Sequence, residues 1–145
     1  MSKKDRILIV DDDPDIRELL SQSLNSDLFE IALAENGEET LRMVGQQKPD
    51  LIILDIMMPG IDGLEVCRRL KENPATSNIP VLMLTAKSGV GDKIEGFVTG
   101  AEEYITKPFD PMNVEARVAT ILRRVKRERA KFQTGVQSTK KDGVV

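Results

Sequence analysis

The chain has 145 residues, of which 40% are hydrophobic and 31% charged, a length and balance typical of one globular domain. This composition excludes a wholly disordered chain, and no apolar run reaches the roughly 20 residues of a membrane span. The single cysteine excludes an intramolecular disulfide, and the absence of histidine excludes Ser-His-Asp catalysis, imidazole metal sites and a phosphohistidine. We therefore expect a soluble, cytoplasmic protein whose chemistry depends on carboxylates, hydroxyls and lysines.

The net charge of −3 conceals an uneven distribution of charge along the chain. Residues 1–110 carry 21 acidic and 12 basic side chains, whereas residues 111–145 carry 3 acidic and 9 basic ones. We therefore expect an acidic body that ends in a basic segment.

Five segments are predicted to form strands. Continuous apolar runs over 7–10, 51–54 and 81–84 favour strands that are covered on both faces, as in a parallel sheet. Residues 29–34 alternate in character and residues 103–106 form a short mixed segment, and both patterns are typical of strands at the edges of a sheet.

Amphipathic segments fill the gaps between these strands and predict five helices. Each begins after a capping or turn signal, and these signals are Asp13-Pro14, Asn36-Gly37, Gly63, the loop 87–91 and Asp110-Pro111. The fourth helix is expected to end at Gly100, since glycine is common just after a helix. Strands and helices therefore alternate five times.

This alternation predicts an α/β fold, a flavodoxin-like (βα)5 doubly wound sandwich. Right-handed crossovers favour a parallel five-stranded sheet in the order 2-1-3-4-5, with helices on both faces. From Thr134 onward the sequence has no apolar face, which predicts a flexible tail. We expect a main domain over residues 1–125, followed over residues 126–145 by a basic helix extension and a flexible tail or linker.

Polar side chains directly follow the strands of the predicted sheet: Asp11, Asp12 and Asp13 after the first, Asp55 after the third, Thr85 after the fourth and Lys107 after the fifth. In a doubly wound sheet the carboxyl ends of the strands open into one crevice, where ligands of such folds bind. We expect carboxylates, a hydroxyl and an ammonium to converge there. Asp13 is interpreted as a helix cap and is left out of the predicted site.

The predicted cluster has the composition of a phosphoryl-transfer site. Two carboxylates about 4 Å apart repel by roughly 4 kcal/mol at an effective dielectric constant of ~20, so the acids need a cation. Oxygen ligands without histidine or cysteine favour Mg²⁺, with Mn²⁺ as the alternative ion. Lys107 adds a positive charge and Thr85 a hydrogen-bond donor for phosphoryl oxygens. Asp55 stands alone after a central strand, which suits a nucleophile that forms an acyl phosphate.

Four motifs carry a family resemblance. The segments ILIVDDDP, LIILDIMMPGIDG, VLMLTA and GAEEYITKPF, in this order and spacing, resemble the receiver domain of bacterial two-component response regulators, of the chemotaxis-regulator type, over about residues 5–125. The resemblance implies a signalling switch of a phosphorelay rather than an enzyme. Such a switch catalyses its own Mg²⁺-dependent phosphorylation from a phosphodonor and its own dephosphorylation.

The resemblance also assigns roles to single residues. Asp55 would accept the phosphoryl group, Asp12 would bind Mg²⁺ directly and Asp11 through water, and the backbone carbonyl of Met57 would be a further metal ligand. Thr85 and Lys107 would contact the phosphoryl oxygens as catalytic residues, and Thr85 and Tyr104 would form the switch. Met57 and Lys87 stand at positions that tune the lifetime of the acyl phosphate in the family.

The implied partners are a histidine kinase or phosphotransfer protein as phosphodonor, and an output partner or effector domain of unknown kind. The surface of the fourth helix, fifth strand and fifth helix is the predicted partner face. A homodimer through this face, or through the C-terminal helix, is left open. For the latter, Val118, Leu122, Val125 and Phe132 would continue a heptad seam, which Arg129 interrupts.

Two other functions were weighed. A haloacid-dehalogenase-like phosphatase also uses an aspartyl nucleophile and Mg²⁺, but Asp15 stands where that family has Thr or Val, and the chain leaves little room for a cap domain. A DNA-binding protein is disfavoured because the body is acidic and no helix-turn-helix is predicted, so we expect no direct DNA binding and no membrane contact. The basic residues between Arg117 and Lys131 are interpreted as a solvated helix end.

Overall fold

One parallel sheet of five strands forms the centre of the protein. The structure, a computed structural model, describes residues 3–24, 26–86 and 100–142, with side chains as far as Lys131. The strands are β1 (Asp5–Val10), β2 (Phe29–Ala34), β3 (Leu51–Asp55), β4 (Val81–Thr85) and β5 (Glu103–Thr106). They pair in parallel in the order β2-β1-β3-β4-β5, which confirms the predicted topology.

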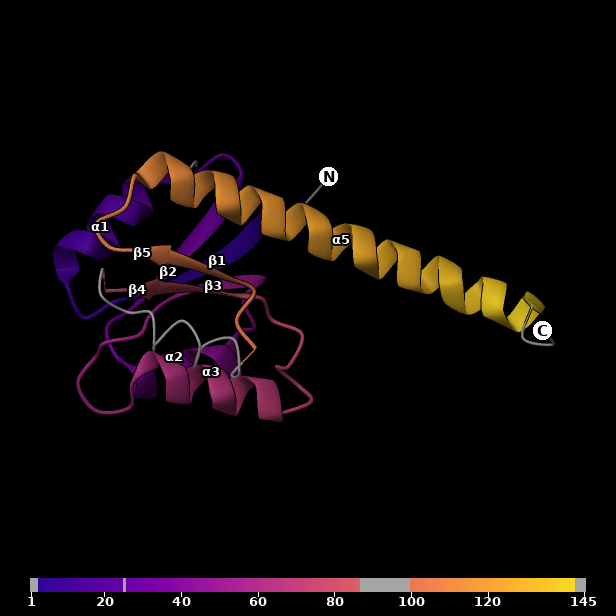
Figure 1. The fold of residues 1–145 in the computed structure, drawn as a ribbon, viewed down its shortest axis with the longest axis horizontal. Helices are drawn as coiled ribbons and strands as arrows, with labels where there is room; N and C mark the ends of the chain where they lie inside the picture. The colour runs from indigo at the N-terminus through magenta and orange to yellow at the C-terminus, as the bar shows by residue number, and fades with distance from the viewer. Residues whose placement is uncertain (1–2, 25, 87–99, 143–145) are drawn as a thin grey trace.

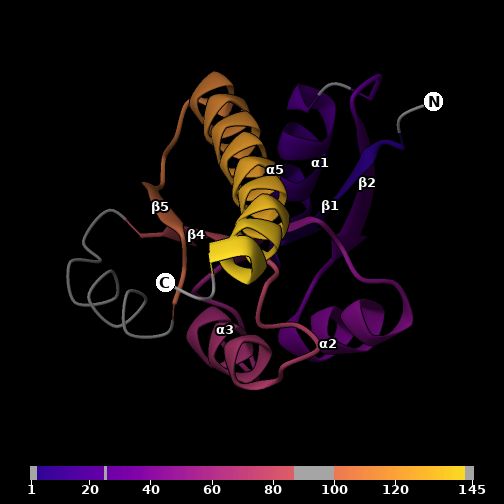
Figure 2. The same cartoon turned by 90° about the vertical axis from the view of Figure 1, so that its right-hand side faces the viewer.

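Helices cover both faces of this sheet. Helices α1 (Pro14–Ser23) and α5 (Pro111–Asp142) lie on one face, and α2 (Gly37–Gln46) and α3 (Gly63–Glu72) lie on the other (Figures 1 and 2). The fourth predicted helix and the loop before it fall on residues 87–99, outside the described residues. Gly100, its predicted end, has a φ of +93°, a backbone conformation that favours glycine.

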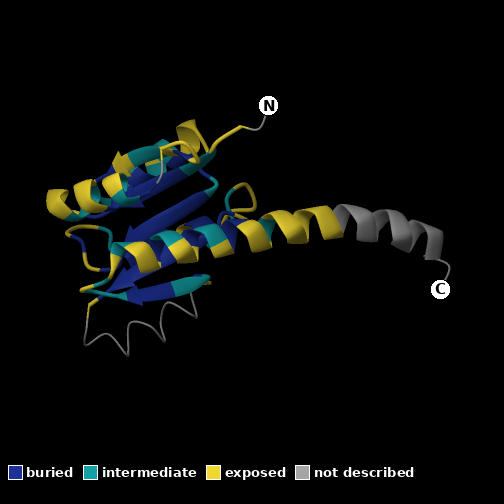
Figure 3. Cartoon of the chain, turned by 90° about the horizontal axis from the view of Figure 1, so that it is seen from above, coloured by how far each residue is buried: buried dark blue, intermediate teal, exposed yellow. Residues whose placement is uncertain are grey.

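The hydrophobic core consists of two layers, one on each face of the sheet. In β3, Ile52 and Leu54 pack in the layer of α2 and α3, whereas Leu51 and Ile53 pack in the layer of α1 and α5. Successive residues of a strand point to opposite faces, so a strand covered on both sides must be apolar throughout. Each such side chain contributes roughly 1.5 to 3 kcal/mol by its burial. Strands β3 and β4 are accordingly buried along their whole length, and β1 is buried from Ile7 onward (Figure 3).

Three helices begin at the capping residues Asp13, Asn36 and Asp62. Each side chain accepts a hydrogen bond of 2.8 to 2.9 Å from a backbone N–H two or three residues further along the chain. These bonds satisfy donors that the first helical turn leaves without an intrahelical partner. Asp13 is thus a helix cap, as the sequence predicts.

Helix α5 is 32 residues long, and only its first half packs on the sheet. Its buried side chains are Val114, Val118, Ile121 and Leu122. An ion pair of 2.7 Å between the Lys126 Nζ and Asp5 carboxylate atoms joins the helix to the start of β1, and residues 126–131 are exposed. The helix then projects from the body (Figure 1). Within the part of the chain that the structure describes, no helix combines the length and apolar character needed to cross a bilayer.

Two expectations for the C-terminal segment need correction. The backbone is helical as far as Asp142, whereas the sequence predicts a flexible tail from Thr134. Residues 126–133 contain strong helix formers and no proline or glycine, so the helix continues without an apolar face up to the segment that the sequence predicts to be a tail. Val118 and Leu122 are buried inside this chain, which removes them from the predicted dimer seam. The division of the chain between residues 125 and 126 stays a prediction.

Candidate functional site

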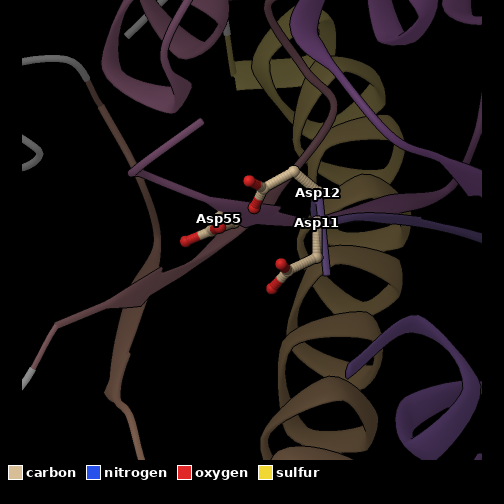
Figure 4. A group of neighbouring side chains, drawn as sticks. All are labelled: Asp11, Asp12 and Asp55. Carbon is tan, nitrogen blue, oxygen red and sulfur yellow. The ribbon is translucent and has the colours of Figure 1, made fainter. Parts of the chain in front are cut away.

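Three carboxylates converge at the carboxyl edge of the sheet. Asp11 and Asp12 follow β1 directly, and Asp55 is the last residue of the adjacent strand β3. One carboxylate oxygen of each residue lies within 4.8 Å of the other two. Figure 4 shows the three side chains beside one another at the ends of their strands. The convergence expected from the topology is therefore present.

Burial makes the negative charges of this cluster energetically costly. Asp11 is fully buried and Asp55 is 3% exposed, whereas Asp12 is exposed. Burial, the largest cause, and the negative charge of Asp11 together raise the pKa of Asp55 from 3.8 to about 7, against the opposing effects of Lys107 and of the Met57 N–H. The Asp55 carboxylate therefore requires a nearby cation to be fully ionised at neutral pH.

Lys107 provides one positive charge between the two buried acids. Its Nζ atom donates a hydrogen bond of 2.9 Å to Asp11 Oδ2 and lies 3.3 Å from Asp55 Oδ1. Burial disfavours its charged form, but the hydrogen bond to Asp11 and the charges of both acids outweigh burial, so the pKa of Lys107 lies above 10.5. The lysine therefore remains an ammonium. The Lys107-Pro108 peptide bond is cis.

The segment after β3 positions Asp55 through close backbone packing. Met57 N–H donates to Asp55 Oδ1 at 3.3 Å, and Gly63 N–H donates to the Ile56 carbonyl at 2.9 Å. A Cβ atom at Gly63 would overlap the Asp55 carbonyl oxygen and lie 2.8 Å from Ile56 Cα. Only glycine therefore lets the start of α3 approach the backbone of the predicted nucleophile this closely. The sequence predicts a turn here but not this contact.

Thr85 and Tyr104 lie on adjacent strands beside the acids. Thr85 is buried at the end of β4, and its carbonyl accepts a 2.7 Å hydrogen bond from the backbone N–H of Lys107. Tyr104 lies in β5 opposite Met83, and its ring is buried in the core layer of α2 and α3. Burial is the main cause that raises the pKa of Tyr104 to about 12. The switch roles of Thr85 and Tyr104 stay predictions.

Of the two predicted tuning positions, the structure describes one. The side chain of Met57 is 62% exposed, two residues after a phosphoacceptor candidate that is almost fully buried. Lys87 lies outside the described residues. The carbonyl of Met57 follows Asp55 closely enough in the chain to remain a candidate metal ligand.

Sequence reasoning missed one basic residue next to the acids. Arg17 of α1 donates a 2.6 Å hydrogen bond from Nη1 to the Asp11 carbonyl, and its Nη2 lies 3.9 Å from Glu35 Oε2. Glu35 and Asp12 line the same hollow, which has a volume of about 340 Å³. No pattern in the sequence distinguishes an arginine that turns back toward the sheet from one that extends into solvent.

The donor set fits a hard divalent cation. The cluster offers three carboxylates and no sulfur or nitrogen ligand, and one of its members is exposed to solvent. Mg²⁺ prefers one or two carboxylates and keeps several waters, so an open, all-oxygen site suits it.

A comparison with protein families identifies the kind of domain that this fold forms. The family model of the response regulator receiver domain matches residues 7–119. The chain belongs to this family. The finding confirms the resemblance drawn from the four motifs, and it gives no support to a haloacid-dehalogenase-like phosphatase. Receiver domains act as signalling switches, interact with histidine kinases and use Mg²⁺ in an acidic pocket, and the acids of this chain could hold such an ion.

Similar proteins include transcription regulators. The chain is 48% identical over 122 residues to the DNA-binding dual master transcriptional regulator RpaA of Synechocystis, a match that covers 84% of this chain and 51% of RpaA. It is 47% identical over 118 residues to the phosphate regulon transcriptional regulatory protein PhoB of Pseudomonas aeruginosa, covering 81% and 52%. The chain therefore spans about half the length of these relatives.

Solved structures share the receiver fold. A putative response regulator from Chloroflexus aurantiacus has a TM-score of 0.79 and 42% sequence identity, over 83% of this chain and 98% of that one. The BeF3-activated DrrB receiver domain has a TM-score of 0.74 and 33% identity, over 83% and 99%. Both likenesses confirm the five-stranded architecture.

The raised pKa of Asp55 predicts that the free energy of unfolding of the metal-free protein depends on pH. Asp55 ionises near pH 3.8 in the unfolded chain and near pH 7 in the folded one. Between these values the folded state holds a proton that the unfolded state has released, so the free energy of unfolding falls as pH rises and then levels off above 7. Asp55→Asn removes this loss, and its stability advantage should grow between about pH 4 and 7, to the order of 4 kcal/mol.

Urea unfolding of both proteins in EDTA across this pH range measures the difference. The matched control is Asp13→Asn, which changes an exposed neighbouring acid to an equally good helix cap. Parallel pH profiles for Asp55→Asn and the parent would contradict the predicted protonation of Asp55.

Gly63→Ala is predicted to displace the backbone of Asp55. The added methyl group forces Asp55 and Ile56 to move, which should lower the free energy of unfolding by about 1 to 3 kcal/mol and weaken Mg²⁺ binding. Gly45→Ala is the control, because a Cβ at Gly45 of α2 meets nothing within 4 Å and should stabilise the helix by about 0.4 to 1 kcal/mol. Thermal unfolding and Mg²⁺ titration measure both effects, and an equal response of the two variants would refute the close packing at Gly63.

Proposed function

We propose that Asp55 accepts a phosphoryl group in a Mg²⁺-dependent reaction and that its phosphorylation switches the surface of β5 and α5. The observation that supports this proposal is the cluster of three carboxylates with the Lys107 ammonium bound to two of them. Phosphoryl transfer depends mainly on alignment and charge neutralisation, and this cluster supplies both.

Asp55 is the nucleophile of the proposed step. The phosphodonor is the phosphohistidine of a histidine kinase or phosphotransfer protein, since this chain contains no histidine. A carboxylate oxygen of Asp55 forms a bond to phosphorus while the phosphorus–nitrogen bond breaks, and the leaving imidazole keeps the electron pair and takes up a proton from solvent. The product is an acyl phosphate on Asp55, which water can later hydrolyse.

Lys107 and the acids prepare Asp55 for this reaction. Only the ionised carboxylate is nucleophilic, and its pKa near 7 means that positive charge must favour ionisation. Lys107 supplies one such charge, and its ammonium is positioned to bind a phosphoryl oxygen afterwards. Asp11, Asp12, Asp55 and the carbonyl of Met57 would hold Mg²⁺, which supplies neutralisation of the charge on the phosphoryl oxygens.

The backbone next to Thr85 offers a route from the site to the surface. Thr85 pairs with Thr106 in the sheet, and its carbonyl binds the N–H of Lys107, so a movement of Thr85 toward the phosphoryl group displaces β5. Strand β5 carries Tyr104, and the adjacent Glu103 binds Arg117 of α5 at 2.7 Å. Phosphorylation thus biases the arrangement of β5 against α5, which is the proposed partner face together with the fourth predicted helix.

Relatives support this assignment. The DrrB receiver domain, whose solved structure is similar to this chain, is described as activated by BeF3. RpaA and PhoB are regulators of transcription, and the match to this chain covers only about half of each. We propose that the output of this receiver likewise passes to a partner or an effector domain.

Phosphorylation of Asp55 can be measured by intact-mass spectrometry. With Mg²⁺ and a small phosphodonor such as acetyl phosphate, the parent should gain the mass of one phosphoryl group, and EDTA should abolish the gain because the acids then repel the donor. Asp55→Asn should gain nothing, whereas Asp13→Asn should behave like the parent. The proposal is wrong if the Asp55→Asn protein becomes phosphorylated. It is also wrong if the parent never gains the group from acetyl phosphate or from a phosphohistidine donor.

A further inference from the structure

Arg17 connects helix α1 to the segment that carries two of the acids. It lies in the second turn of α1, and its backbone N–H donates to the Asp13 carbonyl at 3.2 Å. Its side chain is only 17% exposed and turns back so that Nη1 donates a 2.6 Å hydrogen bond to the Asp11 carbonyl. Arg17 therefore restrains the backbone directly after β1.

The carbonyl that Arg17 binds belongs to the peptide group between Asp11 and Asp12. A peptide group is planar, so fixing its carbonyl also fixes the direction of the N–H on its other side and the position of the next Cα. The N–H of Asp11 donates a second hydrogen bond, of 3.2 Å, to the Ala34 carbonyl. Together these two hydrogen bonds hold the backbone directly before Asp12, and this backbone sets the direction of the Asp12 side chain.

The other end of the guanidinium faces a fourth acid. Nη2 of Arg17 lies 3.9 Å from Glu35 Oε2, and Glu35 lines the same hollow as Asp12. This ion pair is 64% exposed on the Glu35 side and contributes little energy by itself. The guanidinium nevertheless contacts both the Asp11 carbonyl and Glu35, one of the residues that line the hollow with Asp12. The planar fork of arginine suits the simultaneous binding of a carbonyl and a carboxylate.

We propose that Arg17 is a positioning residue for the metal-binding acids: it orients the Asp11–Asp12 peptide so that the Asp12 carboxylate faces Asp11 and Asp55. The proposal rests on the proposed function, because it assumes that these acids bind Mg²⁺. Groups that orient metal ligands typically change metal affinity by 10- to 100-fold when removed.

Mg²⁺ titration followed by isothermal calorimetry and amide NMR shifts tests this role. Arg17→Met keeps much of the aliphatic stem but removes both interactions, and it should weaken Mg²⁺ binding at least about 10-fold. Arg17→Lys keeps the charge and one donor but loses the planar fork, so its affinity for Mg²⁺ should lie between those of Arg17→Met and the parent. The matched control is Arg68→Met, which also removes an arginine bound to glutamates, at Glu65 and Glu72 of its own helix. It should bind Mg²⁺ like the parent.

A second readout needs no metal. In EDTA, the amide signal of Asp12 should shift and its hydrogen exchange should accelerate in Arg17→Met, while amides in the middle of β3 remain as in the parent. Loss of protection throughout the sheet would show a merely structural role and overturn the proposal.

The outcomes separate this proposal from the proposed function. If the parent binds no Mg²⁺ and gains no phosphoryl group, the proposed function itself fails. If the parent binds Mg²⁺ and Arg17→Met binds it within twofold of the parent, or if Arg68→Met loses as much affinity as Arg17→Met, Arg17 is not a positioning residue.

Discussion

Mutual repulsion among three carboxylates, two of them buried, is the constraint on which the rest of the site depends. The fold places one carboxylate oxygen each of Asp11, Asp12 and Asp55 within 4.8 Å of the other two. It provides one ammonium, that of Lys107, between the two buried acids. One positive charge does not balance three negative ones, and burial, together with the charge of Asp11, raises the pKa of Asp55 to about 7 in spite of Lys107. The site is therefore prepared for a second cation and for a ligand that carries its own charge, such as a phosphoryl group.

The parallel sheet explains how residues 96 positions apart in the chain meet. Strand β3 lies between β1 and β4, so its last residue is next to the ends of both neighbours. The apolar run of each strand secures its place in the sheet, and the polar residue after the run is then carried to the same edge. Hydrophobic burial positions the acids, and the same burial makes their charges costly. The burial that stabilises the sheet therefore also raises the pKa of Asp55.

The sequence predicts much of this arrangement because its strongest signals are local. Apolar runs define the strands, Asp13 and Asn36 mark helix starts, and polar residues after the strands identify Asp55 and its neighbours. The contacts of Arg17 and the tight approach of Gly63 depend on where separate segments meet, which no local pattern encodes. The helical backbone beyond Thr134 was also not predicted, because it lacks the apolar periodicity by which helices are recognised.

The most direct test of the central electrostatic constraint is the number of protons released when Mg²⁺ binds. Calorimetric titration in two buffers of different ionisation enthalpy yields this number at each pH. Because the cation must displace the proton of Asp55, the parent should release about half a proton near pH 7 and almost none well above pH 8, and Asp55→Asn should show no such pH-dependent release. Mg²⁺ binding without proton release at any pH, or the same release from Asp55→Asn, would contradict this account.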